Sequence, residues 1–384
     1  MAESIDTLFF ELLRVAIGTQ EVLSRQPNAD EWEELYMMAK KQSVIGICFA
    51  GVQKALSRSA LKGEDFSAIG MSEKLYLTWL GKTTKIKQRN LVVDQQCVAL
   101  QKRLSADGLK SSILKGQGVA QLYAGHLRGL RQSGDIDVYV NCGMEKALAY
   151  AKEKYGDIEY DYINAHVPVF KDTEVELHWR VQALTNVFAN RKLQNWLNEH
   201  QNKVFSGKEW LEVKGERWEI VTPSVEFNAF YILLHCYHHL LESGLGLRQL
   251  MDYYWILYST PTKGEDLKYS DAAKAIAQFG MKKFATGVMW IMKEVFGLPE
   301  EKMLCEANET EGEFLLHEVM QSGNFGHYDE RIKKIGTGKM MSIMNELQHS
   351  LSVASHYPSI VFWRPVWIVY HFLWKRLKKY KQNS

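Results

Sequence analysis

Residues 114–140 read LKGQGVAQLYAGHLRGLRQSGDIDVYV, and this stretch decides the fold that we expect. Its last five residues, Ile136–Val140, are rich in β-branched side chains and predict a strand. Asp135 and Asp137 lie two residues apart at the start of that strand. Because side chains alternate across a strand, both carboxylates point to one face while their apolar neighbours point into a core.

Two carboxylates this close repel each other unless a cation lies between them. A divalent metal is the usual cation, and magnesium binds through one or two carboxylates together with substrate phosphates. Asp135 and Asp137 therefore predict a site for Mg2+, or for Mn2+ in its place. A third carboxylate would complete the two-metal arrangement that clamps the attacking and leaving oxygens in phosphoryl transfer.

Glu176 is the best candidate for that third carboxylate. Val175–Trp179 predicts a strand on which Glu176 and His178 share one face and the apolar residues face the core. Glu174 shares the same face by parity and is the competing choice. His178 either assists proton removal from an acceptor hydroxyl or is a packed strand histidine.

The segments around these strands predict a small mixed α+β unit. Ser111–Leu114 is a short strand, which Lys115-Gly116 interrupts, and Gln117–Tyr123 is a short helix. Another strand is expected at Val167–Phe170, joined to the strand that carries Glu176 by a polar turn.

Helical patterns flank this unit on both sides, so the expected fold class is α+β. We expect a small mixed-sheet core at residues 106–215, between N-terminal helices at residues 1–105 and a C-terminal helical domain at residues 216–384. In the N-terminal part, Asp30–Leu56 and Ser72–Ser105 each predict a long helix, with Asp30 as the cap of the first.

The C-terminal part opens on a helix-start signal. Thr222 can cap the helix, Pro223 suits its first turn, and Glu226 places an acid near its N-terminus. The helix continues to Leu241, and another is expected over Leu247–Tyr258.

The composition excludes several classes of protein. The 384 residues are 46% hydrophobic and 24% charged with a net charge of +2, which argues against disorder and against general coating by nucleic acid. The five cysteines are far apart and form no CxxC pair, as reduced thiols do in a cytoplasmic protein. The N-terminus has acids where a signal peptide needs basic residues, so we expect a cytoplasmic protein.

The stretch quoted first resembles the nucleotidyltransferase superfamily, which has the polymerase-beta-like fold. It is most similar to the bacterial family of uncharacterised nucleotidyltransferases. The residues that carry the resemblance span about 140 positions: Leu114-Lys115-Gly116, Tyr123, Arg128 or Arg131, Gly134-Asp135-Ile136-Asp137, His166, Glu176-Leu177-His178-Trp179, Gly246-Leu247-Arg248 and Asp252.

The resemblance implies that Asp135 and Asp137 bind catalytic metal, that Glu176 completes the triad, and that the turn at Lys115-Gly116 lies against the triphosphate. Most superfamily members carry Gly-Ser at that turn. Here one glycine is kept for close backbone approach, and the lysine supplies a cation. The expected reaction is transfer of a nucleoside monophosphate from an NTP, with ATP as the first candidate, to an unidentified acceptor: a protein, a small molecule or an RNA end.

Other polar residues are candidates for binding the triphosphate or for lining the cleft. Arg128 and Arg131 are either phosphate or acceptor ligands, since guanidinium suits phosphate geometry, or solvated loop charges. His166 lies near the site by resemblance. Arg248 and Asp252 either line the cleft from the helical domain or pair with each other at i, i+4.

Three histidines cluster on one predicted helix, at His235, His238 and His239. Their spacing is compatible with zinc, but they lack the acid of an HExxH pattern, so a polar helix face beside the cleft is the simpler interpretation.

The C-terminus is apolar and aromatic over Ile360–Trp374 and basic after it, and no acidic residue follows Glu346. The apolar run is too short to span a membrane, and it contains Arg364 and Pro365. It is either an amphipathic helix that contacts an anionic membrane surface or a core helix that ends in a solvated basic tail.

Two further functions compete with the enzyme. A catalytically inactive nucleotide-binding or interaction module is favoured by the Lys-Gly turn and opposed by the three carboxylates. A membrane-surface adaptor would act through the C-terminal segment, with nucleotide as a regulatory input.

Overall fold

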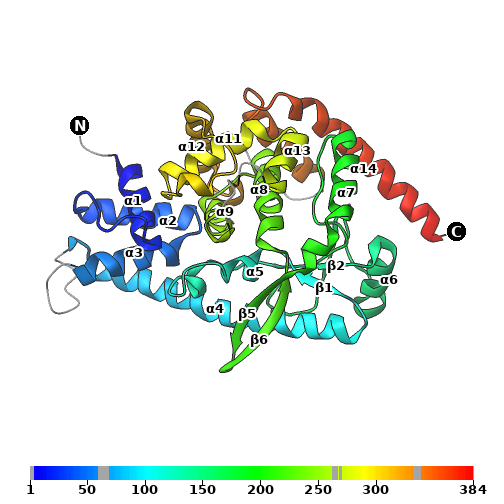
Figure 1. The fold of residues 1–384 in the computed structure, drawn as a ribbon, viewed down its shortest axis with the longest axis horizontal. Coiled ribbons are helices and arrows are strands. Elements are labelled where there is room, and N and C mark those ends of the chain that lie inside the picture. The colour runs from blue at the N-terminus through cyan, green and yellow to red at the C-terminus, as the bar shows by residue number, and fades with distance from the viewer. Residues whose placement is uncertain (1–3, 59–68, 262–266, 268–269, 332–338, 384) are drawn as a thin grey trace.

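The computed structural model describes residues 4–58, 69–261, 267, 270–331 and 339–383. In chain order (Figure 1), its helices and strands are α1 Ile5–Ile17, α2 Ala29–Lys41, α3 Ile45–Arg58, α4 Glu73–Ala106, β1 Ser111–Ile113, α5 Gly116–Ala120, η2 Arg128–Leu130, β2 Ile136–Val140, α6 Gly143–Tyr155, β3 Asn164–Val167, β4 Val175–His178, α7 Val187–Glu199, η3 Gln201–Phe205, β5 Gly207–Val213, β6 Glu216–Thr222, α8 Val225–Glu242, α9 Leu247–Ser259, α10 Asp271–Gln278, α11 Lys282–Glu294, η5 Glu300–Lys302, α12 Glu309–Ser322, η6 Asn324–Gly326, α13 Lys339–Ser352 and α14 Ser359–Asn383.

A four-stranded mixed sheet forms the centre of the fold. Its order is β1-β2-β4-β3, with β2 and β4 parallel and both outer pairs antiparallel. Helices precede and follow the strands of this sheet in the sequence. In Figure 1 the N-terminal helices lie on the left and the C-terminal helices lie above the strands. The predicted α+β class, with a small mixed sheet and flanking helices, is confirmed.

One face of the sheet is apolar because the strands alternate as expected. Ile136, Val138 and Val140 of β2 are at most 2% exposed and share a core with Val175 and Leu177 of β4. Residues of α4 and α6 belong to the same core, so these two helices cover that face. The opposite face is left for the polar residues of the strands.

Helix α4 connects the N-terminal helices to the sheet. Ser72 caps it by accepting a hydrogen bond from the Leu75 backbone N–H, so the predicted start is confirmed to within one residue. The helix runs along the lower edge of the molecule in Figure 1, from α3 to the strands. A second core joins residues of α1–α4 to residues of α8–α12. The division of the chain at residues 105 and 215 stays a prediction.

Three local predictions are wrong. Asp30–Leu56 forms two helices, because Ser43, with φ of 56°, breaks the run, and Asn28 rather than Asp30 caps the first helix. The strand expected at Val167–Phe170 lies three residues earlier, as β3.

The antiparallel hairpin of β5 and β6 was not predicted. It reverses at Lys214-Gly215, where φ is 54° and 80°. Two successive positive φ values are typical of the type I′ turn that closes two-residue hairpins.

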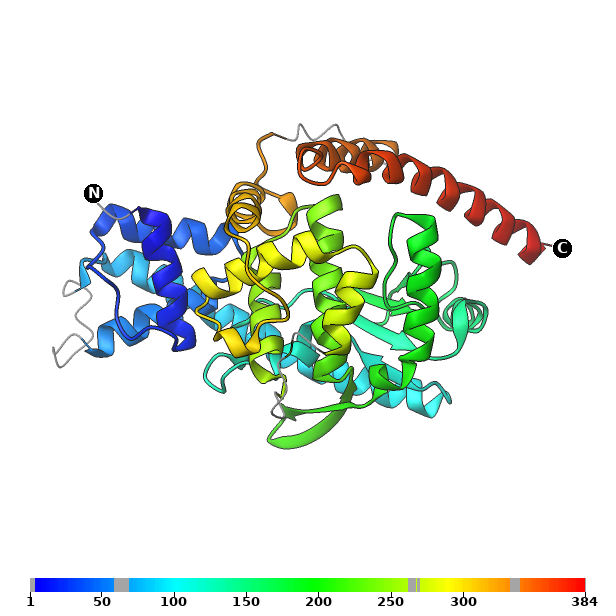
Figure 2. The ribbon, with the colours of Figure 1, turned by 45° about the horizontal axis from the view of Figure 1, so that its top comes forward.

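The C-terminal helices begin as expected, with one change of cap. Ser224, and not Thr222, caps α8 by accepting from the Phe227 backbone N–H. Helix α14 is long and lies across the outside of the molecule, as Figure 2 shows along its upper edge. Among the described residues, no helix combines the length and the apolar character that crossing a membrane requires.

Candidate active site

The polar face of the sheet brings three side chains of the predicted site together. Asp137 of β2 is in parallel register with Glu176 of β4, so the two carboxylates project side by side from adjacent strands. His178 lies two residues further along β4 and shares their face. Asn164 and His166 of β3 are in register with His178 and Glu176 and extend the same polar row.

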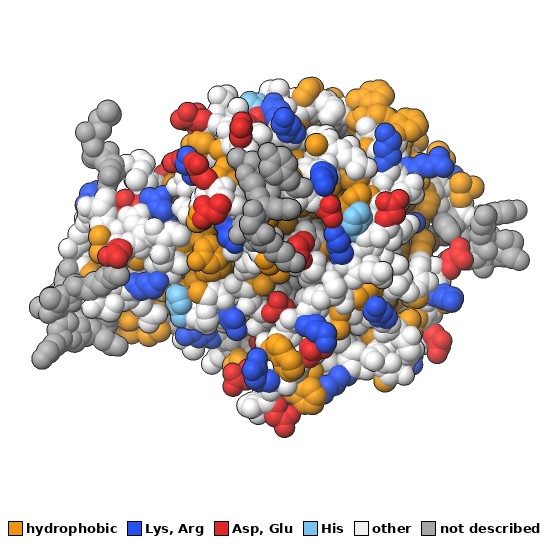
Figure 3. Space-filling view, in the orientation of Figure 1, with side chains coloured by type: hydrophobic (Ala, Val, Ile, Leu, Met, Phe, Trp, Pro, Cys, Tyr) orange, Lys and Arg blue, Asp and Glu red, His pale blue; other side chains and the backbone are white. Residues whose placement is uncertain are grey.

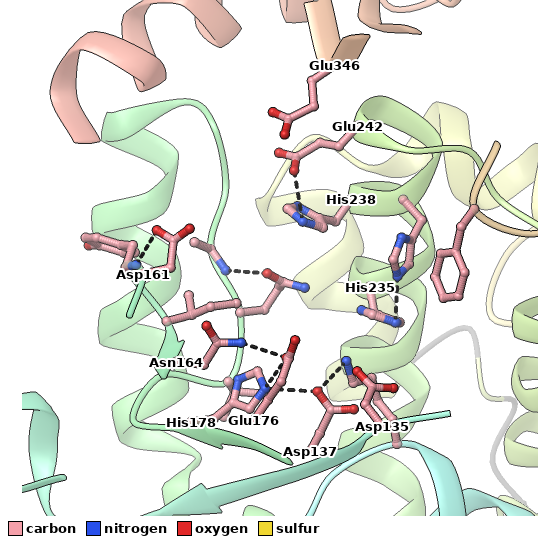
Figure 4. Close-up of a pocket in the computed structure, with 18 of the residues that line it drawn as sticks. Asp135, Asp137, Asp161, Asn164, Glu176, His178, His235, His238, Glu242 and Glu346 are labelled. Carbon is pink, nitrogen blue, oxygen red and sulfur yellow. Dashed lines mark hydrogen bonds and ion pairs between the residues drawn. The ribbon is translucent and has the colours of Figure 1, made fainter. Parts of the chain in front are cut away.

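Asp137, Glu176 and His178 form a tight cluster low in the cavity (Figure 4). The Nε2 atom of His178 lies 2.9 Å from Oδ1 of Asp137 and 3.1 Å from Oε2 of Glu176. Asn164 donates from Nδ2 to the same Glu176 oxygen at 2.6 Å. Asn164 was missed in the sequence because its strand was placed too late. Its parity with His166 is the signal that identifies it.

The cluster is electrostatically coupled. Burial disfavours the charged imidazole of His178, but hydrogen bonds to Asp137 and Glu176 outweigh it and raise its pKa to about 9. Burial likewise opposes ionisation of Glu176, yet the hydrogen bond and charge of His178 lower the pKa of that carboxyl to about 2. These shifts favour a protonated His178 within hydrogen-bond distance of both carboxylates.

Lys115 reaches the same cluster from the turn after β1. Its Nζ lies 2.8 Å from Oδ1 of Asp137, and its side chain is 17% exposed. Burial disfavours the ammonium, but the negative charge of Asp137 outweighs it and raises the pKa of Lys115. The backbone at Lys115 has φ of 24°, which a residue with a side chain adopts only at a cost in strain, as is common at functional sites. Gly116 follows with φ of 47°, a conformation that favours glycine.

The other two predicted or competing acids lie at the edge of the cluster. Asp135 is exposed just before β2 and lines the same cavity, but it is not one of the three tightly grouped side chains. Glu174 is 62% exposed and pairs with Nδ1 of His166 at 2.6 Å. The structure thus places Glu176, and not Glu174, beside Asp137.

The two arginines that are predicted phosphate ligands have different surroundings. Arg131 is buried and bound to both carboxylate oxygens of Asp252 at 2.7 Å. Arg128 donates to the backbone oxygen of Tyr123 and lines a separate depression on the surface. Neither arrangement leaves a guanidinium directed at the cluster.

Arg248 lines the cavity, and its contacts are few. Its Nη1 donates to the backbone oxygen of Gln132 at 3.0 Å, and its buried Nε has no acceptor among the described residues. Burial, followed by the charge of Arg131, lowers the pKa of Arg248 to about 10. The alternative in which Arg248 pairs with Asp252 is wrong, because the ion pair of Asp252 among the described residues is with Arg131.

The histidines of α8 form one wall of the cavity. His235 and His239 meet through their Nε2 atoms at 3.0 Å, and burial lowers the pKa of both, so they are neutral. His238 pairs with Glu242 at 3.1 Å near the top of the cavity (Figure 4). Among the described residues, the group that can hold a metal is the one on the sheet and not this histidine cluster.

A cavity of about 1420 Å³ opens over the polar face of the sheet. Its floor is the sheet, α8 forms one wall, and Arg364 and Trp367 of α14 line its upper part. Arg128 does not line this cavity. The other eleven predicted site residues do: Lys115, Gly116, Arg131, Asp135, Asp137, His166, Glu176, His178, His239, Arg248 and Asp252.

The cluster fits a divalent cation. The ligand atoms of Asp137, Glu176 and His178 lie within 4.8 Å of one another, and Asp135 lies beside them in the cavity. Carboxylate oxygens suit Mg2+ and Mn2+, whereas imidazole suits later transition metals. The donor set therefore accommodates the expected ions through its oxygens.

Comparison with known proteins identifies a family for the chain. A family model described as "Uncharacterised nucleotidyltransferase" matches residues 28–297, which is 270 of the 384 residues and includes the whole sheet. Among solved structures, the chain is similar to an antigenic nucleotidyltransferase-like protein from Paracoccidioides brasiliensis, at 13% identity and a TM-score of 0.31, over 53% of this chain and 91% of that chain. A search of curated proteins found no match. The family match confirms the resemblance carried by residues 114–252, and the chain belongs to the uncharacterised nucleotidyltransferase family.

Proposed function

We propose that this protein transfers a nucleoside monophosphate from an NTP to an acceptor hydroxyl, with release of pyrophosphate. The observation that carries the proposal is the convergence of Asp135, Asp137 and Glu176 with the cations Lys115 and Arg248 on one cavity. Acids that share a face with nearby cations suit a substrate that carries both phosphates and a divalent metal. The acceptor oxygen attacks the α-phosphorus of the NTP. The bond between the α-phosphorus and the leaving pyrophosphate breaks, and the proton of the acceptor hydroxyl passes to solvent or to a cavity base.

Mg2+, or Mn2+ in its place, would be held by Asp137 and Glu176 with Asp135, and it would supply neutralisation of the triphosphate charge. The side chains of the protein bind and orient the nucleotide. Lys115 and Arg248 hold phosphate oxygens, because their cationic groups point into the cavity beside the carboxylates. Asn164 keeps Glu176 in place through its 2.6 Å hydrogen bond. This arrangement orients and stabilises charge, which is how phosphoryl transfer is mainly catalysed.

His178 acts in this proposal as a positioning residue. It holds a proton at Nε2 between Asp137 and Glu176 and so keeps two negative charges on neighbouring strands from repelling each other. Arg131 is a positioning residue as well, because Asp252 binds its guanidinium fully.

A second candidate function is a nucleotide-binding module without turnover. It is favoured by the contacts of Asp137, whose Oδ1 is already within 2.9 Å of both Lys115 Nζ and His178 Nε2. Such internal neutralisation stabilises the fold without any reaction. The two functions differ in one outcome, since both bind nucleotide but the enzyme alone transfers it.

Label transfer separates them. The protein is incubated with each of the four NTPs, with ATP first, labelled at the α-phosphorus, with Mg2+ or Mn2+, and with pools of protein, small molecules and RNA as acceptors. The enzyme is expected to move label into one pool in step with pyrophosphate release. An Asp135→Asn variant abolishes the transfer, and a matched Glu174→Gln variant keeps it. Nucleotide binding without label transfer to any pool would leave the module as the function.

A further inference from the structure

Helix α14 is anchored to the body of the protein by polar contacts on one side. Arg364 is 4% exposed and pairs with Glu242 of α8 and Glu346 of α13. About two turns further along the same side of the helix, Nε2 of His371 lies 2.6 Å from Oδ1 of Asp161. These contacts fix which side of the helix faces the protein.

Aromatic contacts fix the same side. Trp367 and Trp374 both pack on Tyr162, with ring centroids 5.1 Å apart in each case. Trp363 packs on Phe188 at the start of α7 at 5.9 Å. Since these rings and the anchoring charges lie on one side, the opposite side of α14 points outward.

The outward side of α14 is apolar. Phe362, Val369, Phe372, Leu373 and Leu377 are 53–66% exposed. Val369 and Phe372 also line the cavity. Their spacing of 7, 3, 1 and 4 residues places them on one face of a helix. The other side of the helix packs on the protein, with Ile360 in the larger core and Trp374 against the core of the sheet, so the choice between the two interpretations of this segment stays a prediction.

Further apolar side chains enlarge this patch. Val361 and Tyr370, which are 43% and 39% exposed, flank the outward face. In Figure 3, hydrophobic side chains gather at the upper right, where Figure 1 places α13 and α14. Contiguous exposed apolar surface of this kind marks a contact with a membrane or with another protein.

The charge of the segment favours a membrane over another protein as the partner of this patch. Lys375 and Arg376 are followed in the sequence by three more lysines, at positions 378, 379 and 381, and no Asp or Glu follows Glu346. An apolar helix face beside an acid-free basic run complements an anionic lipid surface. A second copy docked through the same face would bring two basic runs into one interface, which like-charge repulsion opposes.

We propose that α14 docks this protein on an anionic membrane surface. Its outward apolar residues enter the boundary between headgroups and acyl chains, and its basic end contacts anionic headgroups. The helix lies in the plane of the surface, because no described helix can span the bilayer. Arg364 and Trp367 of the inward side line the cavity, and so do Val369 and Phe372 of the outward side, so docking places the cavity next to the lipid surface.

Vesicle co-sedimentation of the full chain tests this proposal. Phosphatidylcholine vesicles are compared with vesicles that also contain phosphatidylserine. Phe372→Ser with Leu373→Ser removes two outward side chains, and Leu77→Ser with Leu91→Ser removes two equally exposed side chains from α4. The wild type and the α4 variant are expected to bind the anionic vesicles equally, and the α14 variant at least tenfold more weakly.

A charge variant provides the second arm. Replacing the three lysines at 378, 379 and 381 with glutamine is expected to weaken binding on the order of a hundredfold, about fivefold for each cation. Thermal unfolding confirms that each variant is folded. Binding that is equal for both vesicle types, or unchanged in the α14 variant, overturns the proposal. Absence of vesicle binding overturns it too, and self-association in light scattering that the α14 variant loses would then assign the face to a second copy.

Discussion

Arg131 and Asp252 form a buried two-point ion pair. Nε and Nη2 of the arginine each donate to a different carboxylate oxygen at 2.7 Å, and Tyr123 donates to the same carboxylate at 2.7 Å. The pair joins the segment before β2, which carries Asp135, to α9 of the C-terminal helices. The relative position of the carboxylates and of Arg248 depends on this contact.

Breaking that pair is expected to destabilise the protein strongly. Arg131→Met or Asp252→Leu alone leaves the partner's charge buried and unpaired, which costs about 3–5 kcal/mol. The Arg131→Met, Asp252→Leu double variant is expected to recover part of this loss. Urea unfolding measures all three free energies. Losses below about 1 kcal/mol for both single variants would contradict the role of the pair.

Arg248 is expected to contribute to nucleotide binding and Arg128 is not. Arg248→Gln removes a cation that lines the cavity and has one backbone acceptor, so affinity for an NTP analogue should fall roughly 10- to 100-fold, about 1.5–3 kcal/mol for a charged hydrogen bond. Arg128→Gln is the matched control, because Arg128 lies in another depression. Calorimetric titration compares the two, and the reverse order of effects would return Arg128 to the site.

Much of the site was predictable from the sequence because its determinants are local. Alternation along a strand is enough to place Asp137 and its apolar neighbours on opposite faces. The turn at Lys115-Gly116 is also a local signal, and the structure adds that Lys115 points at Asp137.

What could not be predicted depends on contacts between distant segments. Asn164 was missed because the apolar run Val167-Pro168-Val169-Phe170 suggested a later strand. Proline cannot donate to a ladder, and the pairing ends before it. The choice among the arginines required the fold, since Arg131 meets its carboxylate 121 residues away.

Gly116 is expected to be required for its backbone conformation. Its φ is 47°, so Gly116→Ala should cost about 1–2 kcal/mol and should displace Lys115 next to it, which lowers nucleotide affinity. Gly125→Ala is a suitable control, because an added Cβ there meets no atom within 4 Å. Chemical unfolding and nucleotide titration of both variants check this. A Gly116→Ala protein as stable as the control would show that the turn tolerates a side chain.

Asp94 on α4 is expected to make stability depend on pH. Burial raises its pKa to about 6, although a hydrogen bond from Gln117 opposes the shift. The folded protein therefore binds a proton that the unfolded chain releases near pH 4, and stability falls as pH rises from about 4 to about 6.

Asp94→Asn removes this effect and keeps an acceptor for Gln117. The variant should be more stable than the wild type by about 1–3 kcal/mol at pH 7. The difference should vanish below pH 4, where Asp94 is protonated in both states. Urea unfolding at several pH values measures it, and a constant difference across this range would rule out the ionisation of Asp94 as the cause.

Calorimetric titration with non-hydrolysable analogues of ATP, CTP, GTP and UTP, with and without Mg2+, tests the central claim most directly. The wild type is compared with an Asp135→Asn, Asp137→Asn double variant, and with Asp135→Asn alone because Asp135 is exposed and carries little risk to the fold. We predict that the wild type binds at least one analogue only when Mg2+ is present, and that the tightest-binding analogue identifies the preferred base. Both variants are expected to lose this binding, although thermal unfolding shows that they are folded. Nucleotide binding that persists unchanged in the folded double variant, or no binding of any analogue by the wild type, would contradict the account.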